Sequence, residues 1–352
     1  AYVSTVDSGN LVAALIAVSG VCSETVRAPV LSAARWDGLM DALGWLEEAL
    51  ASLVREPAGE LSLATCAAAI RRRAGAVRND PGAWSATLRD LCDNDCTRLD
   101  ASLLEAIESH KTMLHMPALR EIRVWLDRVH RHLRAMDGDV DELLPWLSVL
   151  DRSTEADAAD QAVVARIVEL LEPTIALDAI PERCARARTL LAGLQAASGK
   201  GSIRQKDWAA ELDTALARSE SVAGALLEDY RRLKQTCENE AFAPDFGFLY
   251  DREQDLFYIG FNMSTGVLDA NHYDLLASEC RLASYIAIAK GDVPAKHWLH
   301  LGRPLTRIGD RIALLSWGGT MFEYLMPRLL LPDYAGTLLD TADRTAVARQ
   351  IE

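Results

Sequence analysis

The residues best suited to chemistry lie in one short stretch, Trp317-Gly-Gly-Thr-Met-Phe-Glu323-Tyr324. An indole beside two glycines is a suitable sugar platform, because the aromatic face stacks on the apolar face of a pyranose and glycine lets a ligand approach the backbone. A glutamate among aromatic side chains can keep its proton near neutral pH, as the general acids of glycoside-cleaving enzymes do. The stretch therefore predicts sugar chemistry, with Glu323 as a catalytic carboxyl group and Trp317 and Tyr324 as binding residues. The alternative is a core tryptophan with a capping or ion-paired glutamate.

A second polar cluster, Asp7-Ser-Gly-Asn10, precedes an apolar helix predicted over Leu11–Val21. These side chains could cap the N-terminus of that helix. The same polar side chains at the mouth of a cavity could bind sugar hydroxyls, with Asp7 and Asn10 as the candidates. The apolar run Leu11–Val18 is shorter than the ~18–20 residues that span a bilayer, so a core helix is expected.

The composition limits the partners of these groups. The chain has 352 residues, 50% of them hydrophobic, which is enough to bury a large core. Its net charge of -14 argues against nucleic acid and an anionic membrane surface, but is compatible with a neutral sugar. The seven cysteines are scattered, as expected for reduced thiols in a cytosolic protein. Only Cys92 and Cys96 are close together and no second ligand pair lies nearby, so no metal and no cofactor are expected.

Three parts of the chain must position these residues: 1–26, 27–240 and 241–352. The middle part has helical periodicity throughout, with apolar faces formed by Leu39, Leu43, Leu46, Leu50 and Leu53, and by Leu119, Ile122, Leu126, Val129, Leu133 and Met136. The arginines between the residues of the second set are expected to form a solvated face. Breaks are expected at 56–57, 79–81, 137–138, 172–173 and 198–201. We predict a helical bundle, inserted between the two end parts.

The last part, 241–352, changes character. Gly247–Asp251 and Leu256–Phe261 flank a polar turn and predict a β-hairpin. An apolar helix is predicted over Tyr273–Ala289, a strand over 312–317, and a further helix from about Thr320. The predicted fold class is all-α, with this small β component.

Several strings in the two end parts resemble the middle domain of cyclic β-1,2-glucan synthases. They are Val3–Leu11, Gly247–Asp251, Leu268–Ala270 with Tyr273–Ser278, Arg281–Val293, His297–Trp298 with His300–Thr306, and Leu314–Trp317 with Gly319–Pro327. The middle part shares only its helical character with that family. The strings add Asp269, Tyr273 and Arg303 to the residues expected to contact sugar.

The resemblance implies a glucoamylase-like (α/α)6 toroid that binds β-1,2-glucan in its central cavity and closes the ring by transglycosylation. It implies other domains of the same synthase as partners, and a parent anchored in the bacterial inner membrane with this soluble segment on the cytoplasmic face. The chain opens with Ala inside a motif. We therefore expect it to be a piece of a larger protein, whose domain continues beyond Glu352 with further acidic residues.

Three functions remain open at this stage. The first is transglycosylation or hydrolysis of β-1,2-glucan. The second is glucan binding or scaffolding without catalysis, if the catalytic carboxylates lie outside this chain. The third is a β-glucoside phosphorylase, which would need basic and hydroxyl side chains for phosphate, with Arg303, Thr306 and Arg307 as the candidates.

Overall fold

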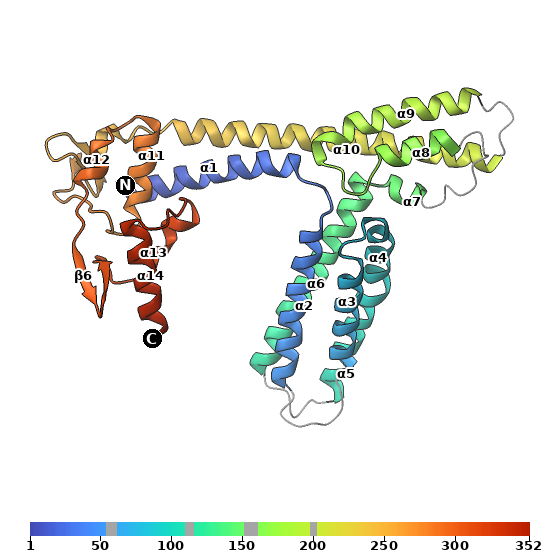
Figure 1. Ribbon diagram of the computed structural model, residues 1–352, viewed down its shortest axis with the longest axis horizontal. Coiled ribbons are helices and arrows are strands. Elements are labelled where there is room, and N and C mark those ends of the chain that lie inside the picture. Colours follow the sequence, from blue (N-terminus) through green and yellow to red (C-terminus); the bar gives the residue numbers. More distant parts are fainter. Residues whose placement is uncertain (54–61, 110–115, 151–160, 198–202) are drawn as a thin grey trace. The chain divides into compact units, whose positions relative to one another are not determined.

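The computed structural model of the chain describes residues 1–53, 62–109, 116–150, 161–197 and 203–352 (Figure 1). These residues are mostly helical and carry only small sheets, which confirms the predicted all-α class. They divide into two compact units. Unit 1 consists of Ala1–Glu24 and Tyr230–Glu352, and unit 2 of Thr25–Asp229. The division falls within two helices, α1 (Thr5–Arg27) and α10 (Ile203–Phe242).

Unit 2 is built from helices whose apolar faces pack together. The predicted faces are buried at Leu39, Leu43, Leu46 and Leu50, and from Ile122 to Met136, while the arginines of the second set are exposed. The predicted breaks at 56–57 and 198–201 lie outside the described residues. The structure does not describe the side chain of Leu53. The helices are α2 (Ala33–Leu53), α3 (Ser62–Val77), α4 (Trp84–Asp90), α5 (Cys96–Ser109), α6 (Met116–Leu143), α7 (Trp146–Leu150), α8 (Gln161–Leu170) and α9 (Ile180–Ala197).

The break predicted at 137–138 is wrong, because α6 continues through Gly138 to Leu143. A single glycine costs a helix interior only about 1 kcal/mol. The buried side chains of Met136 and Val140 keep the apolar face continuous across it. Burial of that face therefore outweighs the local preference for a turn.

Unit 1 is organised around the packing of α1 against α11 (Cys280–Lys290). Val12 and Ala13 share one buried cluster with Leu282 and Ala283. The α1 helix begins at Thr5 rather than near Leu11, so Asp7 and Asn10 lie inside it and the capping role is wrong. Its length and composition would also allow it to cross a membrane, which the short run Leu11–Val18 did not suggest.

The small sheets of unit 1 differ in detail from the predicted hairpin. Strand β2 (Tyr250–Asp251) pairs with β3 (Leu256–Phe257), but 246–249 forms a 3-10 helix. The end of the second run becomes β4 (Gly260–Asn262), which lies between β1 (Tyr2–Ser4) and β5 (Val267–Leu268). Gly260 allows this, because an added Cβ would lie 2.4 Å from the carbonyl oxygen of Val3. The two chain segments of unit 1 are thereby joined in one sheet.

The remaining elements of unit 1 carry the candidate site. They are α12 (Lys296–His300), the antiparallel pair β6 (Leu305–Ile308) and β7 (Arg311–Leu314), α13 (Met321–Leu325) and α14 (Leu338–Ile351). The β6 strand was not predicted. The helix expected from Tyr273 begins only at Cys280, and the backbone of Ser278 adopts a positive φ of 52° just before it. Residues 273–279 instead form the irregular segment that reaches toward α13.

Candidate functional site

Three segments of unit 1 meet at the predicted site: the N-terminal half of α1, the start of α11 and the first turn of α13. Asn10 of α1 donates a hydrogen bond to Glu279, which directly precedes α11. Glu323 of α13 accepts a hydrogen bond from the backbone of Ser278. Gly9 makes the approach of α1 possible, since an added Cβ would lie 2.4 Å from the Cβ of Ala283. Residues far apart in the sequence thus surround one small region.

Glu323 is 6% exposed, and its carboxylate is held by hydrogen-bond donors of the protein. Its Oε1 accepts from the backbone nitrogen of Ser278 at 2.9 Å and from that of Gly318 at 3.1 Å. Its Oε2 accepts from the Gly318 nitrogen at 2.9 Å and from the Ser316 hydroxyl. Glu323 therefore fixes the loop that carries Trp317 to the segment before α11.

Arg281 holds the backbone at the start of α13. Its guanidinium donates to the backbone carbonyl oxygens of Glu323 at 2.6 Å and Tyr324 at 2.5 Å. Burial lowers the pKa of Arg281. Because the Arg281 guanidinium donates to two backbone carbonyl groups, it positions the backbone of Glu323 rather than its carboxylate.

Trp317 forms an exposed aromatic ledge beside the carboxylate of Glu323. Its side chain is 54% exposed, and its indole nitrogen donates to Asp274 Oδ2 at 2.8 Å. Its ring centroid lies 6.2 Å from that of Tyr273, with 36° between the planes. Tyr273 itself is buried, and burial raises its pKa. Trp317 is therefore held in one orientation with much of its ring open to solvent.

A second buried carboxylate, Glu279, lies next to the first and is 8% exposed. Its Oε1 accepts from the Asn10 side-chain nitrogen at 2.9 Å, and its Oε2 from the Ser278 hydroxyl. The Asn10 Oδ1 atom is buried and has no hydrogen-bond partner among the described residues. Asp7 is exposed and near enough to Tyr273 for its charge to contribute to the raised pKa of that phenol.

The other predicted residues have contacts within the protein. The Tyr324 hydroxyl donates to the carbonyl oxygen of Leu314 at 2.6 Å. Asp269 accepts from the Tyr2 hydroxyl, whose pKa is raised to about 12 by burial and by this bond. Arg303 donates to the carbonyl oxygens of Trp298, Leu299 and Leu301 at the end of α12. Each of these three side chains therefore has a partner within the protein, and no contact described for Asp269 or Arg303 brings it to Trp317 or Glu323.

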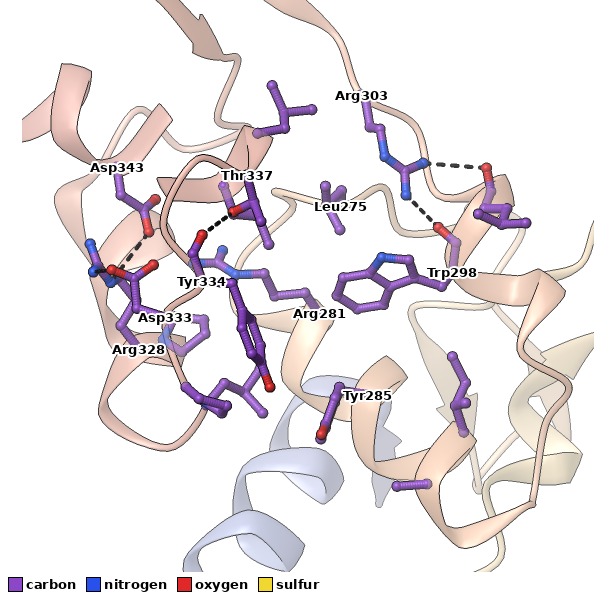
Figure 2. A pocket seen from close by; sticks show the side chains of 18 of the residues that line it. Leu275, Arg281, Tyr285, Trp298, Arg303, Arg328, Asp333, Tyr334, Thr337 and Asp343 are labelled. Carbon is purple, nitrogen blue, oxygen red and sulfur yellow. Dashed lines mark hydrogen bonds and ion pairs between the residues drawn. The ribbon is translucent and has the colours of Figure 1, made fainter. Parts of the chain in front are cut away.

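A separate pocket of about 930 Å³ lies in unit 1 between α11, α12 and the segment leading into α14 (Figure 2). Figure 2 shows Tyr285, Trp298 and Tyr334 on its walls, with Arg328 paired to Asp343 at one side. Of the predicted site residues only Arg303 lines it. Its exposed walls are mainly apolar, although charged side chains such as Arg281, Arg328 and Asp343 also line it.

Sequence reasoning did not single out Asp274, Ser278, Glu279 or Arg281, although most of them lie in the family-like strings. Charged residues that flank an otherwise apolar helix are the signal that could have identified Glu279 and Arg281. Asn10, which donates to Glu279, and the Glu323 carbonyl group, which accepts from Arg281, are more than 40 residues away along the chain. Local pattern alone therefore could not supply their roles.

Comparison with known proteins supports the resemblance of the motifs. No family model matches the chain. Over 351 residues it is 31% identical to the cyclic β-(1,2)-glucan synthase NdvB of Rhizobium meliloti (strain 1021). The match covers 99% of this chain but only 10% of that protein. The chain is therefore similar, over nearly its whole length, to one segment of a cyclic β-(1,2)-glucan synthase, as its motifs predicted.

Proposed function

We propose that this chain forms part of a glucoamylase-like domain that acts on β-1,2-glucan and closes the glucan ring by transglycosylation. The similarity to a segment of a glucan synthase supports the substrate class. The observation that carries the proposal is the exposed Trp317 ring beside the buried carboxylates of Glu323 and Glu279. In this proposal α1 and α11 are helices of an (α/α)6 toroid, unit 2 is an insertion beside it, and the parent protein is membrane-anchored.

The proposed reaction has two steps. A carboxylate attacks the anomeric carbon of a glucosyl unit within the glucan while a second carboxyl group protonates the departing glycosidic oxygen, so that the reducing-end part of the chain leaves as a shorter linear glucan. The 2-hydroxyl at the other end of the same glucan then attacks that carbon, loses its proton to the second group and releases the first. Such retaining pairs lie about 5–5.5 Å apart. We assign one of the two roles to Glu323, with the glucosyl ring stacked on Trp317.

A second candidate function is glucan binding without turnover. It is favoured by the hydrogen bonds to Glu323, because both carboxylate oxygens already accept from donors of the protein. In this case Glu323 holds the Trp317 loop, and the catalytic carboxylates lie in another part of the synthase. The two candidates differ in whether a change at Glu323 removes chemistry or only binding.

The test is ring closure by the full-length protein given linear β-1,2-glucan and no UDP-glucose. Transglycosylation predicts cyclic products in the mass spectrum, each lighter by one water than a linear glucan with the same number of glucose units, together with the shorter linear glucan that is released. Trp317→Ala should lower the affinity for glucan about ten- to hundredfold, as expected for lost stacking of about 1.5–3 kcal/mol. Phe248→Ala, at an exposed aromatic outside this cluster, is the matched control. Linear glucan that binds but stays linear would support the second candidate.

Catalysis by Glu323 is tested without mutation by a trapping reagent. The reagent is a β-1,2-linked oligosaccharide that ends in a 5-fluoro-glucosyl fluoride, since the 2-oxygen of that unit must carry the chain. Fluorine at C5 slows the second step and leaves the nucleophile covalently labelled. A label on Glu323 in the peptide map would assign it as the nucleophile. If another carboxylate is labelled, Glu323 can only be the acid/base, and Glu323→Gln must then abolish turnover.

A further inference from the structure

Ser278 joins the two buried carboxylates of the site. Its backbone nitrogen donates to Glu323 Oε1 at 2.9 Å, and its hydroxyl donates to Glu279 Oε2. Its φ of 52° lies in the left-handed region, which a non-glycine residue seldom adopts. Such conformations persist only where the surroundings impose them, and they gather at functional sites. The backbone of Ser278 is therefore held so that both donors point at carboxylates.

The two carboxylates have no cationic partner that would explain their burial. Among the described residues neither Glu279 nor Glu323 forms an ion pair with lysine, arginine or histidine. Buried carboxylates are ordinarily paired, because an uncompensated charge is costly in the interior. Glu279 is instead held by neutral donors, the Asn10 amide and the Ser278 hydroxyl. Fold stability alone does not favour such a pair of buried acids. The pair therefore points to a role in function.

We propose that Glu279 is a positioning residue for Glu323 and acts through Ser278. This inference rests on the proposed function. Asn10 fixes Glu279 to α1, Glu279 fixes the Ser278 hydroxyl, and the Ser278 nitrogen then fixes Glu323 Oε1 beside the Trp317 loop. Without the anchor at Glu279 the strained backbone of Ser278 relaxes, and the carboxylate of Glu323 loses its orientation toward the ring on Trp317.

The test compares two substitutions at Ser278. Ser278→Gly keeps the backbone donor and removes the hydroxyl, and glycine adopts a positive φ without strain. Relief of the strained φ should offset part of the stability lost with the hydrogen bond, so the variant should melt above Ser278→Ala, yet lose about ten- to hundredfold in kcat, the worth of one hydrogen bond to a charged group. Its KM should stay within about threefold, because the Trp317 ledge is untouched. Ser278→Ala should lose the same activity and also melt lower.

Glu279→Gln should reproduce the loss in kcat, and the double variant with Ser278→Gly should lose no more than either single variant, since both act through one bond. Glu253→Gln is the matched control, because Glu253 is an exposed glutamate outside the site. Measurements use the full-length protein and linear β-1,2-glucan. If Glu323→Gln abolishes turnover while Ser278→Gly and Glu279→Gln keep wild-type kcat, the inference is wrong and the proposed function stands. If Glu323→Gln turns over like wild type, both are wrong.

Discussion

His297 is fully buried and uses both ring nitrogens. Its Nδ1 donates to the carbonyl oxygen of Asp255 at 2.9 Å, and its Nε2 accepts from the Ser284 hydroxyl at 2.8 Å. Burial lowers the pKa of His297, so the folded state keeps the ring neutral where the unfolded state takes up a proton. Protonation of this histidine in the unfolded state should therefore reduce the stability of unit 1 as pH falls below about 6.5.

Chemical denaturation between pH 8 and 5 checks this prediction. His297→Gln should show a smaller loss of stability on acidification than the wild type. His300→Gln, at a half-exposed histidine nearby, should keep the wild-type dependence. An unchanged slope in His297→Gln would show that the ring is not the titrating group.

Asp343 should make unit 1 more stable, not less, as pH falls. It is 2% exposed, and burial raises its pKa to about 6 although Arg281 and Arg328 lie near it. The folded state therefore holds the proton between about pH 4 and 6 while the unfolded state releases it, so stability is lost as pH rises through this range. The expected loss is about 2–3 kcal/mol above pH 6. Asp343→Asn should remove this slope in the same denaturation series, whereas Asp340→Asn, whose pKa is lowered, should not.

At the scale of residues, the type and place of Trp317 and Glu323 could be predicted, but their contacts could not. That the two residues lie close together follows from one short string, but the exposure of the ring and the burial of the carboxylate do not, because a core tryptophan remained the alternative. The donors to that carboxylate come in part from Ser278, 45 residues earlier in the chain. The positive φ of Ser278 has no signal in its residue type, because serine ordinarily avoids it.

At the scale of elements, the crossing of α1 and α11 depends on one missing side chain. A methyl group at Gly9 would lie 2.4 Å from the Cβ and 2.6 Å from the Cα of Ala283. Gly9→Ala must therefore push the helices apart or distort one of them, at a cost of about 1–3 kcal/mol or more. Activity should fall with it, since Asn10 and Glu279 lie at the same crossing.

Gly20→Ala in the same helix is the matched control, because no atom lies within 4 Å of an added Cβ there. That change should stabilise α1 by up to about 1 kcal/mol through helix propensity. Thermal melting and urea denaturation of the two variants check the contrast. Equal destabilisation by both changes would mean that glycine flexibility, and not close packing, matters in α1.

Periodicity predicted the helices of this chain well where one apolar face runs through the element, as in α2 and α6. It failed at element boundaries. The apolar string from Tyr273 looks helical, yet three residues near its start form hydrogen bonds to other segments. Asp274 contacts the Trp317 loop, Ser278 contacts α13 and Glu279 contacts α1. Tertiary hydrogen bonds there outweigh local helix preference, and the charged residues at the boundary indicate such bonds without identifying their partners.

At the scale of the whole molecule, unit 1 should fold without unit 2. Ser19 of α1 donates to Glu238 of α10 at 3.0 Å, so these two helices lie close together near the ends of the two chain segments of unit 1. A linker of about six residues, with a reach of ~20 Å, should join Glu24 to Tyr230. The shortened chain tests the proposal that the helical middle part is an insertion.

The shortened chain keeps only Trp298 and Trp317 of the eight tryptophans, so its fluorescence reports directly on the ledge. We expect a cooperative melt and a change in fluorescence on addition of β-1,2-glucan, which Trp317→Phe should reduce. Failure of the shortened chain to fold, while residues 25–229 fold alone, would show that unit 1 needs the middle part.

The discontinuity of unit 1 also sets the order in which the chain is made. Gly9 leaves the ribosome about 270 residues before Ala283, its packing partner. At about 5–20 residues per second, α1 waits roughly 15–55 s for the helix that covers its apolar face. During most of that time unit 2 can complete its own core, while α1 waits for its neighbours in unit 1, α10 and then α11. We therefore expect unit 2 to reach its native fold before unit 1 as the chain is synthesised.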